Sequence, residues 1–279
     1  MREKSMKINE TIGQNLSPYG EKRIGSINWL GVWTLYKKEV HRFCKVFGQT
    51  VLSPVITTVL FMTIFTVALG GSRRYTGDIS FELFLAPGLI MMAVLQNAFA
   101  NTISSLMTAK MQGNIVDLLL APIGPGEMTL AFTMAAATRA ALVSVFVTSA
   151  MFLFVDLKIS HIWALFYYAI SAAIMLALLG IIAGIWAEKW EQSSSITNFV
   201  IVPLSFLSGT FYSIDRLPGI WHDISQLNPF FYLIDGFRYG IINHADGNLL
   251  IGVIYIAILN GILGFVCYRM FSSGYKLRS

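Results

Sequence analysis

Long stretches without a charged side chain constrain this chain more than any other feature of its sequence. Residues 162–186, for example, contain no Asp, Glu, Lys or Arg. At about 1.5 Å per residue, a helix of this length crosses the roughly 30 Å hydrocarbon core of a bilayer. Only 13% of the 279 residues are charged, against about 25% in soluble domains. The sequence therefore predicts an all-α integral membrane protein, because the alternating segments of a β-barrel do not occur.

Six apolar stretches are long enough to be transmembrane helices. The fifth has an unusual polar content and contains Pro203, which would remove a backbone hydrogen bond near its middle. The residues that precede the first stretch have no apolar core of a signal peptide, and we expect 1–27 to be a disordered cytoplasmic tail. The six predicted spans are residues 50–70, 83–107, 128–155, 162–186, 196–213 and 249–271.

The distribution of Lys and Arg predicts the orientation. Nine basic residues precede the first span, and Arg269, Lys276 and Arg278 follow the last one. Because basic residues concentrate on the cytoplasmic side, both termini are expected in the cytoplasm. The formal net charge of +5 is then explained by topology and contact with anionic lipid, and it predicts no nucleic-acid partner.

The sequence offers no motif of an enzyme or a metal site. Its two cysteines, Cys44 and Cys267, stand far apart, and its four histidines match no metal-ligand spacing. Neither the G-x-S-x-G motif nor the Gly-Lys dipeptide of a P-loop occurs. We expect no catalytic residue, no metal and no cofactor bound by this chain, so any ATP and Mg²⁺ would be bound by another chain.

Residues 28–48 alternate apolar and charged side chains at helical spacing. This pattern predicts an amphipathic helix at the cytoplasmic interface, with Trp and Tyr at the level of the headgroups. Such a helix is either a simple anchor or an anchor that also contacts a cytoplasmic partner.

The stretch GNIVDLLLAPIGPGE at residues 113–127 lies between two predicted spans and is bounded by Pro and Gly. It predicts a short cytoplasmic helix at about 114–121, capped by Asn114 and ended by Pro122. A two-turn helix with an exposed apolar surface suits insertion into a groove on a soluble partner. The alternative is a helix that lies back on lipid.

Polar side chains recur at spacings of three and four in the second and fifth spans. This spacing places them on one helix face, which has to meet protein or water because unpaired amides in lipid are costly. The two stripes predict either the lining of a transport pathway or hydrogen-bonded helix packing. Arg139, in the third span, is either an ion-paired or snorkelled anchor or a residue for coupling or substrate. The candidate pathway residues are Asn97, Asn101, Ser104, Asn198 and Ser205.

The segment after the fifth span, residues 211–248, carries too many charges for a spanning helix. Pro218 and Pro229 divide it, which predicts a pair of re-entrant half-helices at about 215–242 on the outer side. An ordinary amphipathic outer loop is the alternative.

Five motifs in this order resemble a type-2 ABC transporter permease, in the bacterial inner-membrane branch that exports drugs, lipooligosaccharides and polysaccharides. The resemblance runs from about residue 28 to the C-terminus. The motifs are KEVHRF at 38–43, APGLIMM at 86–92, DLLLAP at 117–122, FLSGTFY at 206–212, and LNP at 227–229 with Asp235 and Arg238.

The resemblance implies a transport subunit that works as a homodimer beside two copies of a cytoplasmic ABC ATPase, which binds ATP and Mg²⁺. Glu39 and Arg42 would contact that ATPase, and Asp117, Leu118 and Leu119 would dock in its cleft. Asn228, Pro229, Asp235 and Arg238 would belong to half-helices that cap the outer end of the pathway. An amphiphilic or lipid-linked substrate would move between the two copies of the first, second and fifth spans.

Two other functions are alternatives to an ABC permease. An ion-coupled secondary transporter would need buried carboxylates and an inverted repeat, and the predicted spans contain essentially no Asp or Glu. An intramembrane enzyme would need a convergent catalytic set at membrane depth.

Overall fold

The computed structural model describes residues 27–69 and 79–277, which form helices and no extended strand. The all-α prediction is confirmed for this part of the chain. The predicted tail at 1–27 lies outside the described residues except for Ile27. The elements are α2 (Trp29–Lys45), η1 (Gly48–Leu52), α3 (Ser53–Leu69), α4 (Phe81–Met111), α5 (Ile115–Leu120), α6 (Pro125–Met151), α7 (Ile162–Trp186), α8 (Trp190–Ile196), η2 (Thr197–Ile201), α9 (Val202–Phe206), η3 (Ile214–Arg216), α10 (Ile220–Leu227), α11 (Pro229–Ile242) and α12 (Leu249–Ser273).

Five helical segments among the described residues are long and apolar enough to cross a membrane. The span predicted at 162–186 has the same bounds in the structure, and the other four differ from the predicted bounds by a few residues. The five segments are Gly48–Val67, Phe81–Met111, Pro125–Met151, Ile162–Trp186 and Leu249–Ser273.

The fifth predicted span, 196–213, has different bounds and is not one regular α-helix. Helical turns run from Trp190 to Phe206 through α8, the π-helical turn η2 and α9. The π turn lies just before Pro203, where the ring removes a backbone donor. After Phe206 the chain turns through Gly209, which has a positive φ of 72°. The predicted count of six spans is therefore not confirmed by these helices and stays a prediction.

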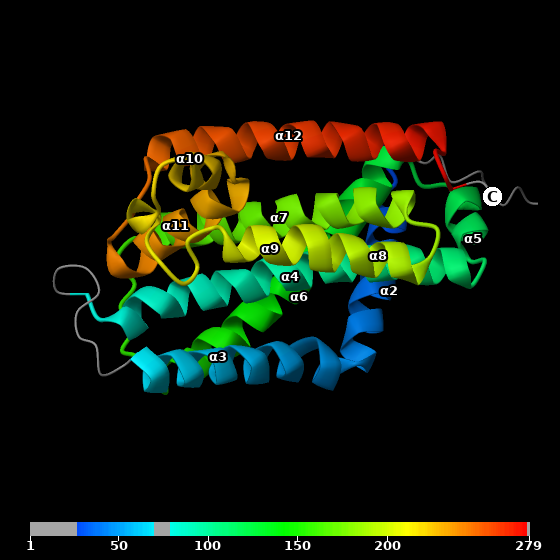
Figure 1. Cartoon of the computed structure of the whole chain (residues 1–279). Helices are drawn as coiled ribbons and strands as arrows, with labels where there is room; N and C mark the ends of the chain where they lie inside the picture. Colours follow the sequence, from blue (N-terminus) through cyan, green and yellow to red (C-terminus); the bar gives the residue numbers. More distant parts are fainter. Residues whose placement is uncertain (1–26, 70–78, 278–279) are drawn as a thin grey trace, which may run out of the picture.

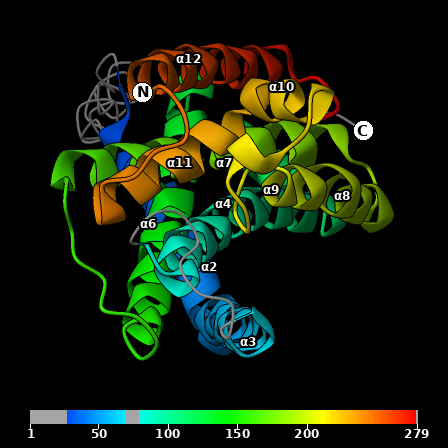
Figure 2. The ribbon, with the colours of Figure 1, turned by 60° about the vertical axis from the view of Figure 1, so that its left-hand side comes forward.

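Helices α4 and α7 form the centre of the bundle, and α3 and α12 lie along its opposite long edges (Figure 1). The same order is visible from a second direction (Figure 2). In an apolar 18-residue window of each segment, the buried share is 83% for α4. The corresponding share is 22% for Gly48–Val67, which contains α3, and 11% for α12. The two edge helices are thus the ones left for contact with lipid or with another protein.

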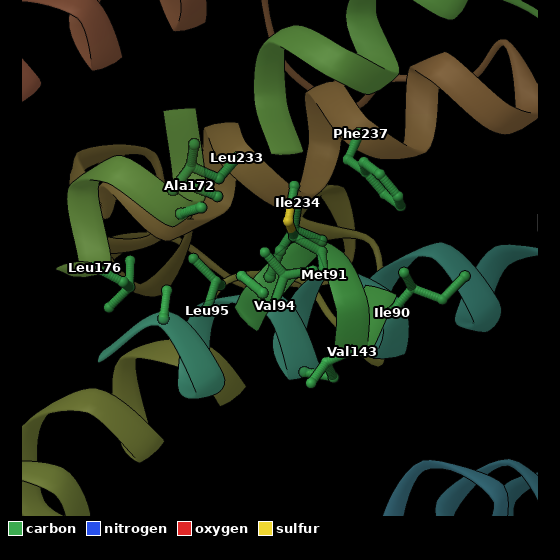
Figure 3. Close-up of a cluster of buried hydrophobic side chains, with 14 of the residues drawn as sticks. Ile90, Met91, Val94, Leu95, Val143, Ala172, Leu176, Leu233, Ile234 and Phe237 are labelled. Carbon is green, nitrogen blue, oxygen red and sulfur yellow. The ribbon is translucent and has the colours of Figure 1, made fainter. Parts of the chain in front are cut away.

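The main core gathers side chains from α4, α6, α7 and α11 (Figure 3). Close packing of α7 on α4 depends on Gly180, since a Cβ there would lie 2.6 Å from the carbonyl oxygen of Phe99. Gly184, one turn later, also faces α4, at Leu106. The small-xxx-small pattern of this span therefore serves packing between these two helices.

Candidate functional site

Helix α5 lies at one end of the bundle, away from α10 and α11 (Figure 1). Its Ile115 and Leu118 are 5% and 8% exposed and pack in a core cluster that includes Val32 and Leu35 of α2. Its other face is open, with Leu120 78% exposed. We name the exposed Val116, Asp117 and Leu120, with the partly exposed Leu119, the α5 knob.

This placement refines the predicted docking residues. Asp117 and Leu119 reach the surface, whereas Leu118 anchors α5 to the bundle. The predicted Asn114 cap is wrong, since its side chain makes no capping bond and donates to Gln112 Oε1 instead. Asn114 already has helix-like backbone angles, so its amide does not face the first turn.

The loop that follows α5 is attached to the start of α2. Asn28 donates from its side chain to the carbonyl of Pro122 at 2.7 Å and from its backbone to Glu127 Oε1 at 2.6 Å. Glu127 also accepts from the backbone of Gly124 at 2.8 Å through Oε2. One carboxylate therefore joins the N-termini of α2 and α6 next to α5.

Glu39 and Arg42, which the resemblance predicts to contact an ATPase, both make bonds within the bundle. Arg42 Nε donates to Glu39 Oε2 at 2.9 Å, and its Nη2 donates to the carbonyl oxygen of Asn101 at 2.8 Å. Its Nη1 donates to Ser104 Oγ at 3.2 Å. Because the Glu39 side chain has no exposed surface, it is not available to a separate subunit in this conformation. The pair fixes α2 against the polar face of α4.

A hollow of about 490 Å³ lies beside this pair. Two guanidinium groups border it, from Arg42 on α2 and from Arg139 on α6, and Asn97 Oδ1 accepts from Arg139 Nη2 at 3.1 Å. We call it the arginine hollow. Its remaining walls come from η1, α3, α4, η2 and α9, with Gln49, Thr50, Gln96, Ser104 and Thr197 among the polar lining residues.

A smaller hollow of about 150 Å³ continues from the arginine hollow between α3 and α4. The two share Ser53, Pro54, Gln96 and Asn97. Beyond these, the smaller hollow is lined by Thr57, Thr58, Phe61, Leu89, Met92 and Ala93. Together they form one path that begins at two guanidinium groups and ends at a wall of mixed threonine and apolar side chains.

The predicted pathway residues divide into three groups. Asn97 and Ser104 line the arginine hollow, and Asn101 lies fully buried behind it, where its side chain and carbonyl accept from Arg42. Asn198 is exposed on η2, outside the lining. Ser205 is fully buried and donates to the carbonyl of Ile201, so it satisfies its own helix. The spacing in the second span located side chains at one hollow, whereas the spacing in the fifth span did not.

Gln49 and Gln96 line the arginine hollow and were missed by the sequence reasoning. Gln96 precedes Asn97 and falls at the edge of the polar stripe, so extending the stripe by one residue would have found it. Gln49 lies in the π-helical turn η1, which no sequence pattern indicated.

At the opposite end, α11 is held by a set of polar contacts that we call the α11 clamp. Asp235 accepts from the backbone N–H groups of Asp246 and Gly247, both at 2.9 Å, and lies 3.6 Å from Arg238. Arg238 donates to the carbonyl of Gly209 at 2.6 Å. Asn228 caps α11 and donates to the carbonyl of Leu204 at 2.9 Å.

Next to the α11 clamp, the segment after α9 packs closely against α4. A Cβ on Gly88 of α4 would lie 2.6 Å from the carbonyl oxygen of Thr210, so only glycine allows this approach. Pro229 is the first residue of α11, where its missing N–H costs nothing. The four predicted outer residues are thus brought together, and three of them make the bonds that fix α11.

Two lysines cover the C-terminal carbonyls of α7 at the α5 end. Lys110 donates to the carbonyls of Ile185 and Ala187, and Lys276 reaches the carbonyl of Trp186. Lys276 also pairs with Glu188 at 2.8 Å, and its hydrogen bond holds the pKa of Glu188 below the usual value. The same bond raises the pKa of Lys276. The positive charges of Lys110 and Lys276 are stabilising next to the negative, C-terminal end of the α7 dipole.

Comparison with known proteins gives a consistent result. The profile of the family described as "ABC-2 type transporter" matches residues 31–242. The inner membrane transport permease YadH of Escherichia coli (strain K12) is 35% identical over 254 residues, which are 90% of this chain and 98% of YadH. Nodulation protein J of Rhizobium leguminosarum bv. viciae is 27% identical over 245 residues, covering 84% of this chain and 91% of that protein.

Proposed function

This chain belongs to the ABC-2 type transporter family, and on that premise we propose that it is the permease subunit of an ATP-driven exporter in a bacterial inner membrane. Family membership makes it a membrane transport permease and confirms the resemblance seen in the sequence motifs. ATP as the energy source, export as the direction and an amphiphilic or lipid-linked cargo are the steps that we add.

The single observation that carries the proposal is the α5 knob. An apolar side chain such as Leu120, at 78% exposure, is costly at the end of a bundle unless another surface covers it. The knob is short and rigidly bounded by Pro122 and Pro125, as suits insertion into a groove of a cytoplasmic ATPase. ATP and Mg²⁺ would bind that ATPase, in two copies.

The arrangement of the helices supports a pathway shared by two copies of this chain. The helical turns at 190–206 would complete the sixth crossing, next to η1, α3 and α4 around the arginine hollow. In this proposal α2 is an interfacial helix, and α5 and both ends of the chain are cytoplasmic, in agreement with the basic residues there. Helices α10 and α11 would be re-entrant and cap the outer end.

The proposal is tested by purifying the tagged chain from its native membranes in mild detergent and identifying the bound proteins by mass spectrometry. We expect a stoichiometric P-loop ATPase. The variant Leu120→Glu should lose it, because a carboxylate replaces the apolar contact. The matched control is Leu153→Glu, a leucine of similar exposure (83%) just after α6, which should retain the ATPase.

Each alternative result has a defined meaning. An ATPase that remains bound to Leu120→Glu would exclude the α5 knob as the docking element. A homo-oligomer isolated repeatedly without any ATPase would overturn the proposal in favour of an ion-coupled transporter.

A further inference from the structure

The arginine hollow contains more positive charge than its own residues neutralise. Arg42 is paired with Glu39 at 2.9 Å. Among the described residues, Arg139 makes one hydrogen bond, to Asn97, and no ion pair. Its Nε is buried without a hydrogen-bond partner in the same part of the chain. The hollow therefore presents one uncompensated guanidinium.

The amide next to Arg139 contacts its guanidinium without neutralising its charge. Asn97 donates to the carbonyl of Ala93 at 3.0 Å, which turns its Oδ1 toward Arg139. A guanidinium without an ion pair at the wall of a hollow is best satisfied by an acceptor that carries negative charge.

The carboxylates described in this chain do not pair with Arg139. Glu39 of α2 is the carboxylate bonded to an arginine of the hollow, and its side chain is fully buried against Arg42. Glu82 lies in the first turn of α4, and Asp235 lies in the α11 clamp. The counter-charge therefore has to come from a ligand or from ions in water.

The position of the hollow selects the source of the anion. Gln49 and Thr50 belong to η1, where the first span begins directly after the amphipathic α2. The start of a span after an interfacial helix lies at the level of the lipid headgroups. The path then continues into the smaller hollow, where Phe61, Leu89 and Met92 offer apolar contacts beside Thr57 and Thr58.

We propose that the arginine hollow binds the anionic headgroup, a phosphate or a carboxylate, of an amphiphile from the adjacent leaflet, and that the smaller hollow takes the start of its apolar tail. Arg139 forms the ion pair, and Arg42 adds positive potential from the opposite wall. This inference rests on the proposed transport function and narrows the substrate to anionic amphiphiles.

The test measures lipid binding to the purified full chain by native mass spectrometry. Dioleoyl phosphatidylglycerol is titrated against dioleoyl phosphatidylcholine, which has the same tails and no net charge. We expect the anionic lipid to bind at least about tenfold more tightly, as a single charge-assisted contact gives. The variant Arg139→Gln should abolish this preference.

Two further variants keep the result interpretable. Gln96→Glu places a carboxylate in the shared wall of the two hollows and should abolish the preference without removing any arginine. Arg269→Gln, at an exposed position of α12, serves as the control for unspecific attraction and should leave the preference unchanged. Thermal unfolding checks that each variant is folded.

Four results would overturn the inference. The first is equal affinity for the two lipids, and the second is a preference that survives both Arg139→Gln and Gln96→Glu. The third is an equal loss of the preference in Arg269→Gln, and the fourth is displacement of the lipid by inorganic phosphate at the same concentration as by phosphatidylglycerol. The last result would show a site for free anions. Because this assay contains no ATPase, it fails independently of the proposed function, which is decided by the ATPase that co-purifies.

Discussion

Buried charges connect separate helices in this bundle. The ion pairs Glu39–Arg42 and Asp235–Arg238 differ in the elements that they connect. Glu39 and Arg42 attach α2 to α4, whereas Asp235 and Arg238 attach the chain segments on both sides of α11. Both are i, i+3 pairs on one helix. Removal of one partner of such a pair leaves a buried charge without compensation, which costs more than the pair itself contributes.

Asp235→Asn should destabilise the protein strongly. The carboxylate uses both oxygens to accept from Asp246 and Gly247, and an amide has one oxygen and no charge to offer Arg238. We expect a loss of about 3–5 kcal/mol in the free energy of unfolding, measured by thermal or denaturant unfolding in detergent. The control is Asp156→Asn, whose carboxylate is 85% exposed and 4.0 Å from Lys158. A change equal to that of the control would show that Asp235 is dispensable for α11.

Sequence spacing predicted residue faces well and residue partners poorly. Asn97, Asn101 and Ser104 were expected on one face, and all three lie in or behind the arginine hollow. Asn101 and Ser104 are bound by Arg42, which lies 59 and 62 positions earlier in the chain, and Asn97 is bound by Arg139, 42 positions later. The periodicity of a helix is a local property, whereas the pairing of α2 with α4 depends on tertiary packing.

At the scale of elements, the bundle depends on how closely α7 approaches α4. Both helices are long and apolar, so burial alone would permit many relative rotations. Gly180 and Gly184 of α7 favour one of these rotations, because the absence of a Cβ leaves room for Phe99 and Leu106 of α4. In lipid, where apolar surfaces gain little from mutual burial, such close packing is a main source of helix association.

Gly180→Ala tests this approach. A Cβ at Gly180 would lie 2.6 Å from the carbonyl oxygen of Phe99, so the backbones have to separate and the variant should lose about 1–3 kcal/mol. Gly261 in α12 is the matched control, since nothing lies within 4 Å of its Cβ position. Gly261→Ala should be neutral or slightly stabilising, because alanine favours a helix more than glycine. Equal unfolding temperatures for the two variants would contradict close packing of α7 on α4.

Element boundaries show where sequence reasoning was insufficient. The span at 162–186 was predicted with its observed bounds, because both its length and its apolar content are local properties. The region predicted as 196–213 was misplaced because its end depends on distant contacts. Gly209 turns the chain, Arg238 binds that turn, and Gly88 leaves room for it. None of these contacts is visible in a hydropathy pattern.

At the scale of the whole molecule, a continuous set of contacts connects the α5 knob with the arginine hollow. Asn28 binds Pro122 and Glu127 near α5, and α2 extends from Asn28 to the region of Arg42. Arg42 then binds Asn101 and borders the hollow. Motion of a partner at the knob therefore has a direct mechanical route to the proposed substrate site, provided that α2 moves as a rigid helix.

Asp117→Arg should uncouple transport while leaving membrane insertion intact. The Asp117 side chain is exposed on the α5 knob and makes no hydrogen bond or ion pair with the residues that the structure describes. Reversal of its charge should disturb the interface with the ATPase and lower transport per ATP hydrolysed by about fivefold or more. The measurement is ATPase activity and substrate transport of the assembled complex in proteoliposomes. An unchanged ATPase response to substrate would contradict a coupling role for this residue.

The Glu127→Gln variant separates docking of the ATPase from transmission of its motion to the arginine hollow. Glu127 accepts from Asn28 at 2.6 Å and from Gly124 at 2.8 Å, and a glutamine side chain offers one acceptor in place of two. The loss of a charge-assisted bond should weaken the connection of α2 to α6 by about 1–3 kcal/mol. The α5 knob itself is unchanged, so the ATPase should still co-purify, while transport per ATP hydrolysed falls by about fivefold.

The matched control for this change is Glu191→Gln, an exposed carboxylate in the first turn of α8 at the same end of the bundle. It should leave both docking and transport unchanged, since it joins no two of the elements that lead from α5 to the hollow. If Glu127→Gln also loses the ATPase, the contact between α2 and α6 shapes the docking surface itself. If it retains both docking and transport, the motion reaches the arginine hollow through α4, which is joined to α5 directly by residues 112–114, and α2 serves only as an anchor.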